Sequence, residues 1–326
     1  MKTPSIDPPR LIVCAIGLLF VAPVLASTSP LSPAIFAPGV ISGPNHEAAP
    51  AFTPDGKTVY FQRSSVRGGT ILVSHLAHGR WSKPEIAPFS GAWNDIEPAM
   101  APDGSFLVFI SNRPSAPGGE PIHGTYNGSS QDGGNMWRVE RHGAGWGEPV
   151  RLPDTINRST TIFAPAVVAD GSLYFMDTYG EKPRFRLYRS QFKGGTYEPA
   201  QPLVFSDGTT TDVDPAVAPD ESFMIFGSGR PPAAKSIDLF IVRRQGSGWG
   251  SPVHLGEELN TPGSDAEPRL SPDLKTLYFS SERTVPISYP RALDQARQDL
   301  ERSQLWDNGQ YNIWYVPVAA LPQVSD

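Results

Sequence analysis

The sequence has little cysteine, little charge and no long apolar stretch. Cys14 is the single cysteine among 326 residues, so the chain cannot form an internal disulfide or a metal centre that needs several thiolates. Lysine and arginine (27) are outnumbered by aspartate and glutamate (33), and the formal net charge is −6. A mildly acidic chain without a basic stripe is poorly suited to nucleic acid, which we exclude as a partner. The apolar run at residues 11–21 is too short to span a membrane.

The N-terminus has the features of an export signal. A weakly basic start leads into the apolar run, and small residues then surround Ala26. This pattern predicts a signal peptide over residues 1–26, cleaved after Ala26, and a short linker over 27–34. An uncleaved anchor is the alternative. A valine precedes Cys14, which argues against lipidation, and cleavage would leave the mature chain without cysteine. We therefore expect a periplasmic or secreted protein with no stable membrane span after signal cleavage.

Glycine (31) and proline (35) are abundant instead, and many of them fall in a repeated phrase. The phrase joins a leading proline to a Pro-Asp-Gly turn, or a variant of it, and then to a short apolar stretch. Its five copies are "PAFTPDGKTVYF" (50–61), "PAMAPDGSFLVF" (98–109), "PAVVADGSLYF" (165–175), "PAVAPDESFMIF" (215–226) and "PRLSPDLKTLYF" (268–279). Self-similarity at this spacing indicates a repeat architecture.

Each copy predicts a β-hairpin, because Pro-Asp-Gly favours a tight turn and the flanking residues have strand pattern. A third strand follows, and then a fourth with an aromatic residue and a proline, as in "GAGWGEPVRL" (143–152) and "GSGWGSPVHL" (246–255). Four antiparallel strands at this period form a propeller blade. We predict an all-β fold, a five-bladed β-propeller over residues 35–318, with a tail at 319–326. The blade cores are expected to start near residues 48, 96, 163, 213 and 266.

The two ends of the predicted propeller complement each other. The last unit lacks a fourth strand with an aromatic residue and a proline, whereas "AIFAPGVIS" (34–42) at the start has both but no blade before it. We predict that this N-terminal segment completes the last blade and closes the ring, because closure removes open sheet edges.

These motifs resemble the TolB-like, WD-like propeller repeats of bacterial envelope proteins. The stretch "GSGWGSPVHLGEELNTPGSDAEPRLSPDLKTLYFSSER" (246–283) carries them together: the Trp-x-x-Pro strand, the acid-proline start, the turn and the Phe-x-Ser-x-Arg end of the second strand. The resemblance covers about 35–318. It implies the propeller fold and says little about activity, since this architecture hosts many functions.

Two insertions depart from a minimal blade. Residues 114–134 and 284–310 both lie between the second and third strands of their blades, and 292–305 has a helical pattern. Long insertions on a rigid scaffold are often binding elements, although they can also be tolerated additions. If they bind a ligand, their exposed aromatic residues are the candidates: Tyr126, Tyr289 and Trp306.

Carboxylates gather just before the leading prolines. Three residues before them lie Glu47, Asp95, Asp212 and Asp265, and one residue before them lie Glu97, Asp214 and Glu267. Both positions point the same way in an extended chain, which predicts an acidic ring at one mouth of the channel. An arginine follows the second strand only in the blades with an acid directly before proline. We therefore predict three structural ion pairs: Glu97 with Arg113, Asp214 with Arg230 and Glu267 with Arg283.

The remaining acids have no evident cation in this scheme. Glu47, Asp95, Asp212 and Asp265 would repel one another unless they are solvated or neutralised, and His46 lies beside them. A Ca²⁺ ion at Asp95, Asp212 and Asp265, or a ligand amine, would neutralise them. Alternatively they cap the loops between blades by accepting backbone hydrogen bonds. No other cofactor is expected.

The sequence favours binding over catalysis. It contains no Gly-x-Ser-x-Gly elbow, no phosphate-binding loop and no dinucleotide fingerprint in strand–helix context. Acids at equivalent positions of a repeat are typical of a scaffold. We predict a monomeric, non-catalytic TolB-like module that binds a protein or a cell-envelope ligand. The alternative is a carbohydrate-active enzyme of the glycoside hydrolase type, or a glycan-binding propeller, that uses the acidic mouth.

Overall fold

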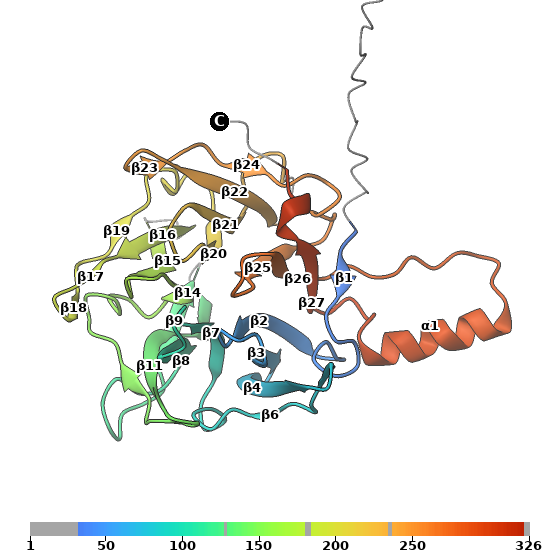
Figure 1. Cartoon of the computed structure of the whole chain (residues 1–326), viewed down its shortest axis with the longest axis horizontal. Coiled ribbons are helices and arrows are strands. Elements are labelled where there is room, and N and C mark those ends of the chain that lie inside the picture. Colours follow the sequence, from blue (N-terminus) through green and yellow to red (C-terminus); the bar gives the residue numbers. More distant parts are fainter. Residues whose placement is uncertain (1–31, 127–128, 180–183, 234–236, 323–326) are drawn as a thin grey trace, which may run out of the picture.

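The chain forms a five-bladed β-propeller in which antiparallel sheets surround a central axis (Figure 1). The computed structural model describes residues 32–126, 129–179, 184–233 and 237–322. The predicted fold class is confirmed. The predicted signal peptide and the end of the predicted tail lie outside the described residues. No helix in the described ranges combines the length and the apolar character of a membrane span.

The blades follow one another along the chain, each from its innermost strand outward. Blade 1 contains β2 (His46–Phe52), β3 (Thr58–Ser65), β4 (Gly68–Ala77), β5 (Arg80–Trp81) and β6 (Glu85–Ile86). Blade 2 contains β7 (Asp95–Met100), β8 (Phe106–Ser111), β11 (Asn135–His142), β12 (Gly145–Trp146) and β13 (Val150–Arg151). Blade 3 contains β14 (Phe163–Val167), β15 (Leu173–Tyr179), β16 (Arg184–Ser190), β17 (Phe192–Lys193), β18 (Thr196–Tyr197) and β19 (Gln201–Pro202). Blade 4 contains β20 (Asp212–Val217), β21 (Phe223–Ser228), β22 (Asp238–Gln245), β23 (Gly248–Trp249) and β24 (Val253–His254). Blade 5 contains β25 (Asp265–Leu270), β26 (Thr276–Ser281), β27 (Asn312–Pro317) and, from the chain start, β1 (Ala34–Ile35).

The hairpin turns form where the repeated phrase places its aspartate and glycine. Asp55 accepts hydrogen bonds from the Thr53 hydroxyl (2.7 Å) and the Lys57 amide (3.0 Å). Gly56 then adopts a φ of 66°, which costs glycine little. This turn fixes the register between the first two strands of the blade.

The fourth strand is divided into two short pieces by its proline. In blade 1, Trp81 of β5 pairs with Leu76 of β4, and Ile86 of β6 pairs with Leu72 of β4. Pro84 stands between the pieces and has no amide hydrogen to donate. The aromatic residue of this strand packs between blades: the Trp146 Nε1 of blade 2 donates to the Tyr60 hydroxyl of blade 1 at 2.9 Å. The tryptophan phrase is therefore architectural.

The predicted closure of the ring is confirmed. Strand β1 pairs with β27, with Ala34 opposite Tyr315 and Ile35 opposite Trp314. Phe36 is buried and its ring lies 5.1 Å from that of Tyr278 in blade 5 and 5.6 Å from that of Trp81 in blade 1. The N-terminal segment thus completes blade 5 and also contacts blade 1.

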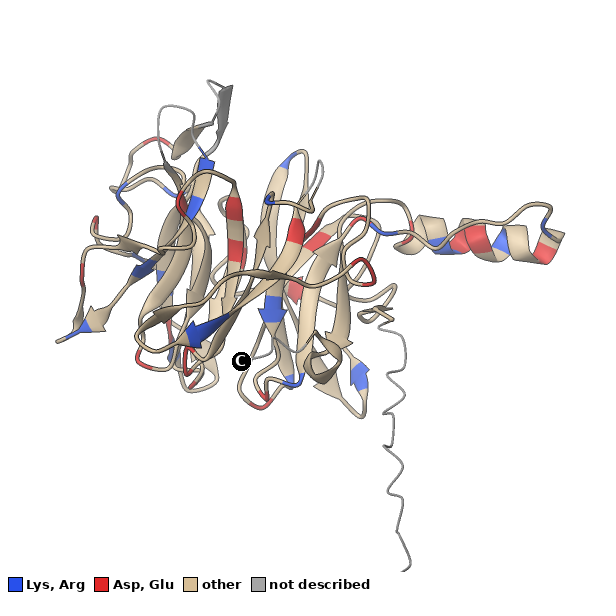
Figure 2. Ribbon diagram, turned by 90° about the horizontal axis from the view of Figure 1, so that it is seen from above, with Lys and Arg blue, Asp and Glu red and all other residues tan. Residues whose placement is uncertain are grey.

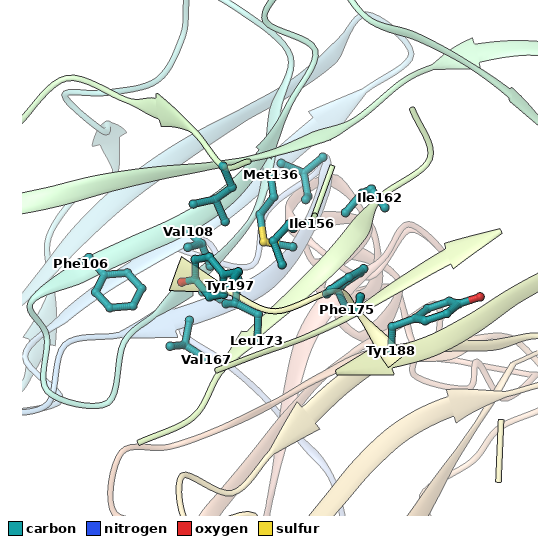
Figure 3. Packing of buried hydrophobic residues seen from close by; sticks show 14 of the residues in the cluster. Phe106, Val108, Met136, Ile156, Ile162, Val167, Leu173, Phe175, Tyr188 and Tyr197 are labelled. Atoms are coloured by element: carbon teal, nitrogen blue, oxygen red, sulfur yellow. The ribbon is translucent and has the colours of Figure 1, made fainter. Parts of the chain in front are cut away.

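Apolar side chains fill the spaces between neighbouring blades. Figure 3 shows one such cluster, in which Phe106 and Val108 from blade 2 face Leu173 and Phe175 from blade 3. Alternate residues of each strand point to opposite faces of its sheet, so each blade contributes to the packing on both sides. This packing holds the innermost strands in fixed positions around the axis.

Both insertions leave their blades between the second and third strands, as predicted. The first forms a hairpin of β9 (His123–Tyr126) and β10 (Ser129–Asp132). The second carries the helix α1 (Leu293–Leu305), which projects away from the ring as an arm with charges of both signs (Figures 1 and 2). The predicted helix is confirmed. A short 3₁₀ turn, η1 (Val318–Ala320), follows β27.

Candidate functional site

The acids three residues before the leading prolines are held by arginines. Asp95 accepts a hydrogen bond from the Nη1 atom of Arg113. In the corresponding pairs the Nη2 atom of Arg230 donates to Asp212 (2.7 Å) and the Nη2 atom of Arg283 donates to Asp265 (2.9 Å). The structure therefore contradicts the predicted pairs of Glu97 with Arg113, Asp214 with Arg230 and Glu267 with Arg283. It also contradicts the expectation that Asp95, Asp212 and Asp265 lack a cation.

The register of the hairpin explains this pairing. Asp265 lies opposite Ser281, and Arg283 follows two residues later on the same face. The Arg283 Nε donates to the Ser281 hydroxyl at 2.9 Å, and its guanidinium lies 4.9 Å from the Phe279 ring centroid. The serine and phenylalanine of the Phe-x-Ser-x-Arg motif thus position the guanidinium so that it pairs with one aspartate. Blades 2 and 4 repeat it with Phe109, Ser111 and Arg113, and with Phe226, Ser228 and Arg230.

Blade 1 pairs its acid with an arginine at a different position of the second strand. Ser65 occupies the place of the arginine that follows the second strand in blades 2, 4 and 5. Glu47 instead pairs with Arg63, which lies directly opposite in the register, at 2.7 Å. Burial raises the pKa of Glu47, and Arg63 opposes that rise. The end of the β3–β4 hairpin is therefore not needed for the ion pair.

The acids directly before the prolines are turned aside by a β-bulge in every innermost strand. The five residues at this position have φ values between 49° and 54°: Ala49, Glu97, Ala164, Asp214 and Glu267. A residue in this left-handed conformation interrupts the alternation of side chains and re-aims its own. The sequence-based prediction treated these strands as regularly extended, which is why it chose the wrong acid.

These bulge positions connect neighbouring blades through side chain to backbone hydrogen bonds. The Glu97 carboxylate accepts from the Ala164 amide of the next blade at 2.6 Å, and Asp214 accepts from the Glu267 amide at 3.1 Å. In blade 1, where Ala49 has no carboxylate, the Gln62 amide oxygen accepts from the Glu97 amide at 3.1 Å. The bulge acids thus join blade 2 to blade 3 and blade 4 to blade 5, and Gln62 joins blade 1 to blade 2.

The three bulge acids lie close enough to affect one another's protonation. Burial, together with the nearby carboxylates of Asp214 and Glu267, raises the pKa of Glu97 to about 8. Burial and the Glu267 carboxylate raise the pKa of Asp214 to about 7. Burial also raises the pKa of Glu267, whose carboxylate accepts a hydrogen bond from Ser280 at 2.9 Å. Burial and mutual repulsion therefore favour the protonated forms of these carboxyl groups, and Glu97 and Asp214 are buried.

The described residues offer no ready metal centre at the predicted position. No three His, Cys, Asp or Glu side chains among them gather in a way that could hold a metal ion. Asp95, Asp212 and Asp265 belong to separate blades, and each carries its own arginine. His46 packs edge-on against the Tyr311 ring at 4.5 Å, and burial lowers its pKa. The structure therefore does not bring the predicted calcium ligands together.

A polar groove of about 760 Å³ opens at the same end of the ring, beside blade 1. The β3–β4 hairpin end forms one wall, with Arg67 at its tip, and the loop that carries Trp93 forms the other. Both side chains are exposed. The described residues that line the groove include Arg63 and Arg67 and no carboxylate. The sequence-based analysis missed this groove, because its residues carry no motif and meet only in the folded ring.

The two insertion aromatics whose side chains are described, Tyr289 and Trp306, do not form one surface. Tyr289 is exposed on the arm, with the Arg291 guanidinium 5.3 Å from its ring. Trp306 is only partly exposed and packs edge-on against Trp314 at 5.7 Å, so it belongs to the base of the arm rather than to a free binding face. Tyr126 lies in β9, and its side chain is outside the described residues.

Comparisons with known proteins support the fold. No protein-family model and no curated protein sequence matches the chain. The structure is similar to an α-L-arabinofuranosidase from Lactobacillus brevis (12% identity, TM-score 0.53, covering 87% of this chain and 92% of that one). It is also similar to the catalytic domain of an α-L-arabinofuranosidase from Coprinopsis cinerea (10% identity, TM-score 0.51, covering 90% and 99%). A putative TolB from Agrobacterium tumefaciens shares 16% identity over 84% of this chain and 91% of that one, with a TM-score of 0.48. At these identities the likeness to the two arabinofuranosidase structures supports the fold of the chain, and no more.

Proposed function

We propose that the protein is an exported, non-catalytic propeller that binds a protein or cell-envelope ligand in the groove beside blade 1. The observation that carries this proposal is that one arginine at this end of the ring, unlike those beside it, is not used in an ion pair. Four acids at this end of the ring are held in ion pairs by arginines, whereas Arg67 lines the groove and forms no ion pair with any described residue; the four are Glu47, Asp95, Asp212 and Asp265.

The lining of the groove favours a ligand with anionic and hydrogen-bonding groups. Arg63 is paired with Glu47, so Arg67 supplies the positive charge of the described lining, which contains no carboxylate. Trp93 offers an exposed aromatic face, and such a face stacks well on a flat apolar or sugar surface. Asn45 and Asn112 add amide groups that can donate and accept hydrogen bonds. Its size falls within the range of roughly 300–1,000 Å³ that is typical of ligand sites.

The alternative reading is a glycoside hydrolase. The arabinofuranosidases among the solved structures are enzymes by name, but hydrolysis requires two accessible carboxyl groups on either side of the scissile bond. Glu97, Asp214 and Glu267 are buried in the channel or occupied by hydrogen bonds, and Asp95, Asp212 and Asp265 are held by arginines. The observed roles of these acids favour a scaffold over a catalytic pair.

The binding test compares three variants with the parent protein, and Asp95→Asn and Asp212→Asn are added for the hydrolysis assay. Trp93→Ala and Arg67→Ala change the two walls of the groove, and Lys193→Ala removes an exposed cation from blade 3 as a matched control. Each protein is immobilised, exposed to cell-envelope extract and probed on a glycan array, and arabinofuranoside hydrolysis is measured in parallel.

We expect a ligand that the parent and Lys193→Ala retain and that both groove variants lose at unchanged melting temperature. Retention of every ligand by Trp93→Ala and Arg67→Ala would show that the groove is not the site. Hydrolysis that disappears in Asp95→Asn or Asp212→Asn, without unfolding, would replace the binding function with the enzymatic one.

A further inference from the structure

A second cavity lies on the axis of the ring, at the end opposite the groove. It has a volume of about 120 Å³ and is lined by residues from all five innermost strands. Turn residues such as Pro54, Pro102 and Pro272 also line it, which places it at the end where the first and second strands of each blade are joined. Most of the lining consists of proline and alanine, so the walls are apolar and close together.

One residue breaks the pattern of this cavity. The residue after each leading proline has the same place in the hairpin register, and it is alanine in blades 1 to 4: Ala51, Ala99, Ala166 and Ala216. In blade 5 this residue is Arg269, opposite Tyr278. A long cation thus replaces a methyl group in the wall of an apolar channel.

The guanidinium of Arg269 is poorly satisfied by the protein. The residue is 7% exposed, and its Nη1 donates to the Pro268 carbonyl at 2.8 Å. Its Nε and Nη2 are buried and have no hydrogen-bond partner among the described residues. Arg269 forms no ion pair with a described carboxylate, although Glu97, Asp214 and Glu267 feel its charge at longer range.

A buried guanidinium without a partner is costly. The penalty for burying an ion in a protein is several kcal/mol unless a counter-charge and hydrogen bonds compensate it. None of the three channel carboxyl groups forms an ion pair with Arg269 among the described residues, and burial raises the pKa of each, which favours their neutral form. The missing partner should therefore be an anion from solution.

We propose that the axial cavity is a binding site for a small organic carboxylate, anchored by Arg269. A planar carboxylate can accept two parallel hydrogen bonds from a guanidinium, which a spherical ion cannot. The proline and alanine walls suit a methyl or a short alkyl group on the other side of the anion. A cavity of roughly 150 Å³ accommodates benzene, so this cavity of about 120 Å³ has room for an acid of the size of acetate and not for an aromatic acid. This site is separate from the groove and does not depend on the function proposed for it.

Isothermal titration of the full chain with acetate, at fixed ionic strength, tests the proposal. Arg269→Ala restores the residue found in the other four blades and removes the anchor. Arg297→Ala, on the exposed face of α1, removes one arginine far from the channel and is the control for net charge. We expect saturable binding in the parent and in Arg297→Ala, and affinity roughly ten- to hundred-fold lower in Arg269→Ala, as for loss of a charged hydrogen bond.

Two further arms use the parent protein alone, so the test stands even if Arg269→Ala fails to fold. Formate should compete with acetate, and benzoate, which is too large, should not. Binding should weaken as the pH rises through about 7 to 8, where Asp214 and Glu97 ionise and repel an anion. Burial also raises the pKa of Glu267, and it raises that of Tyr311, which stays neutral in this range. No saturable heat with acetate, equal affinity in Arg269→Ala, or benzoate binding as tightly as acetate would each overturn the proposal.

Discussion

Replacing Glu97 with glutamine should make the protein more stable at neutral and alkaline pH. Burial and two neighbouring acids raise the pKa of Glu97 from 4.5 to about 8. The folded chain therefore keeps a proton that the unfolded chain releases between these values, and stability falls as the pH rises through this window. Below pH 4.5 both states are protonated, and above pH 8 both are ionised, so the slope is confined to the interval between them.

The magnitude follows from the two pKa values. At pH 7 the lost stability is roughly 3 kcal/mol relative to acidic solution, by proton linkage. Glutamine has no titrating group, and its amide oxygen can still accept the hydrogen bond from the Ala164 amide that Glu97 accepts at 2.6 Å. Removing this carboxyl group also eases the ionisation of Asp214 and Glu267, because the charges repel one another.

Urea unfolding curves measured across the pH range check this prediction. The difference in unfolding free energy between Glu97→Gln and the parent should grow in favour of the variant from pH 4.5 to pH 8 and then level off. Glu198→Gln, at an exposed position of blade 3, is the control and should run parallel to the parent. Parallel curves for Glu97→Gln as well would show that Glu97 does not hold a proton in the folded state, and the reasoning would be wrong.

Three further predictions concern the ring and its export. Phe36→Ala should lower the free energy of unfolding by roughly 3–5 kcal/mol, because it leaves a cavity between blades 5 and 1. Deletion of 34–42 should lower it further. The control Val66→Ala, at an exposed position, should change it very little in the same urea assay. Arg283→Met should cost roughly 3–5 kcal/mol by leaving the buried Asp265 carboxylate unpaired, whereas Arg297→Met on the arm should cost less than about 1 kcal/mol, and equal melting temperatures would refute the buried pair. If the signal peptide is as predicted, N-terminal sequencing of the exported protein should begin at Ser27, and a start at Met1 would show an uncleaved anchor.

The large-scale fold was accessible from the sequence because it depends on features that repeat. A proline, a turn and an aromatic residue in each unit define the strands and their number, and Phe36 with Pro38 at the chain start was enough to predict the closure. These features act locally, through turn geometry and side-chain alternation. They are readable without knowing which residues meet across the ring.

The partners of the charged residues were not accessible in the same way. The prediction assigned Arg113 to Glu97, whereas a bulge with φ of 53° at Glu97 turns that side chain toward the next blade and leaves Asp95 facing the arginine. A one-residue bulge leaves little trace in a sequence when a glutamate rather than a glycine occupies it. Asp95, two positions before the predicted Glu97, is the acid that pairs with Arg113. Glu97 accepts the hydrogen bond from the next blade instead.

The positions where the repeat fails therefore carry most of the information about function. The Phe-x-Ser-x-Arg motif that pairs an arginine with an aspartate recurs in blades 2, 4 and 5. Because this arginine has the same structural role in three blades, no ligand is needed to explain it. Blade 1 lacks the arginine of this motif, and there the end of the β3–β4 hairpin, with Arg67, lines an open groove. Blade 5 has an arginine where the other blades have alanine, and there two guanidinium nitrogens lack a partner inside a cavity. In both places a cation is present that the pseudo-symmetric scaffold does not use. A scaffold of repeats can hold its shape without these two arginines, so an anion that binds them gives the most economical reason for their presence.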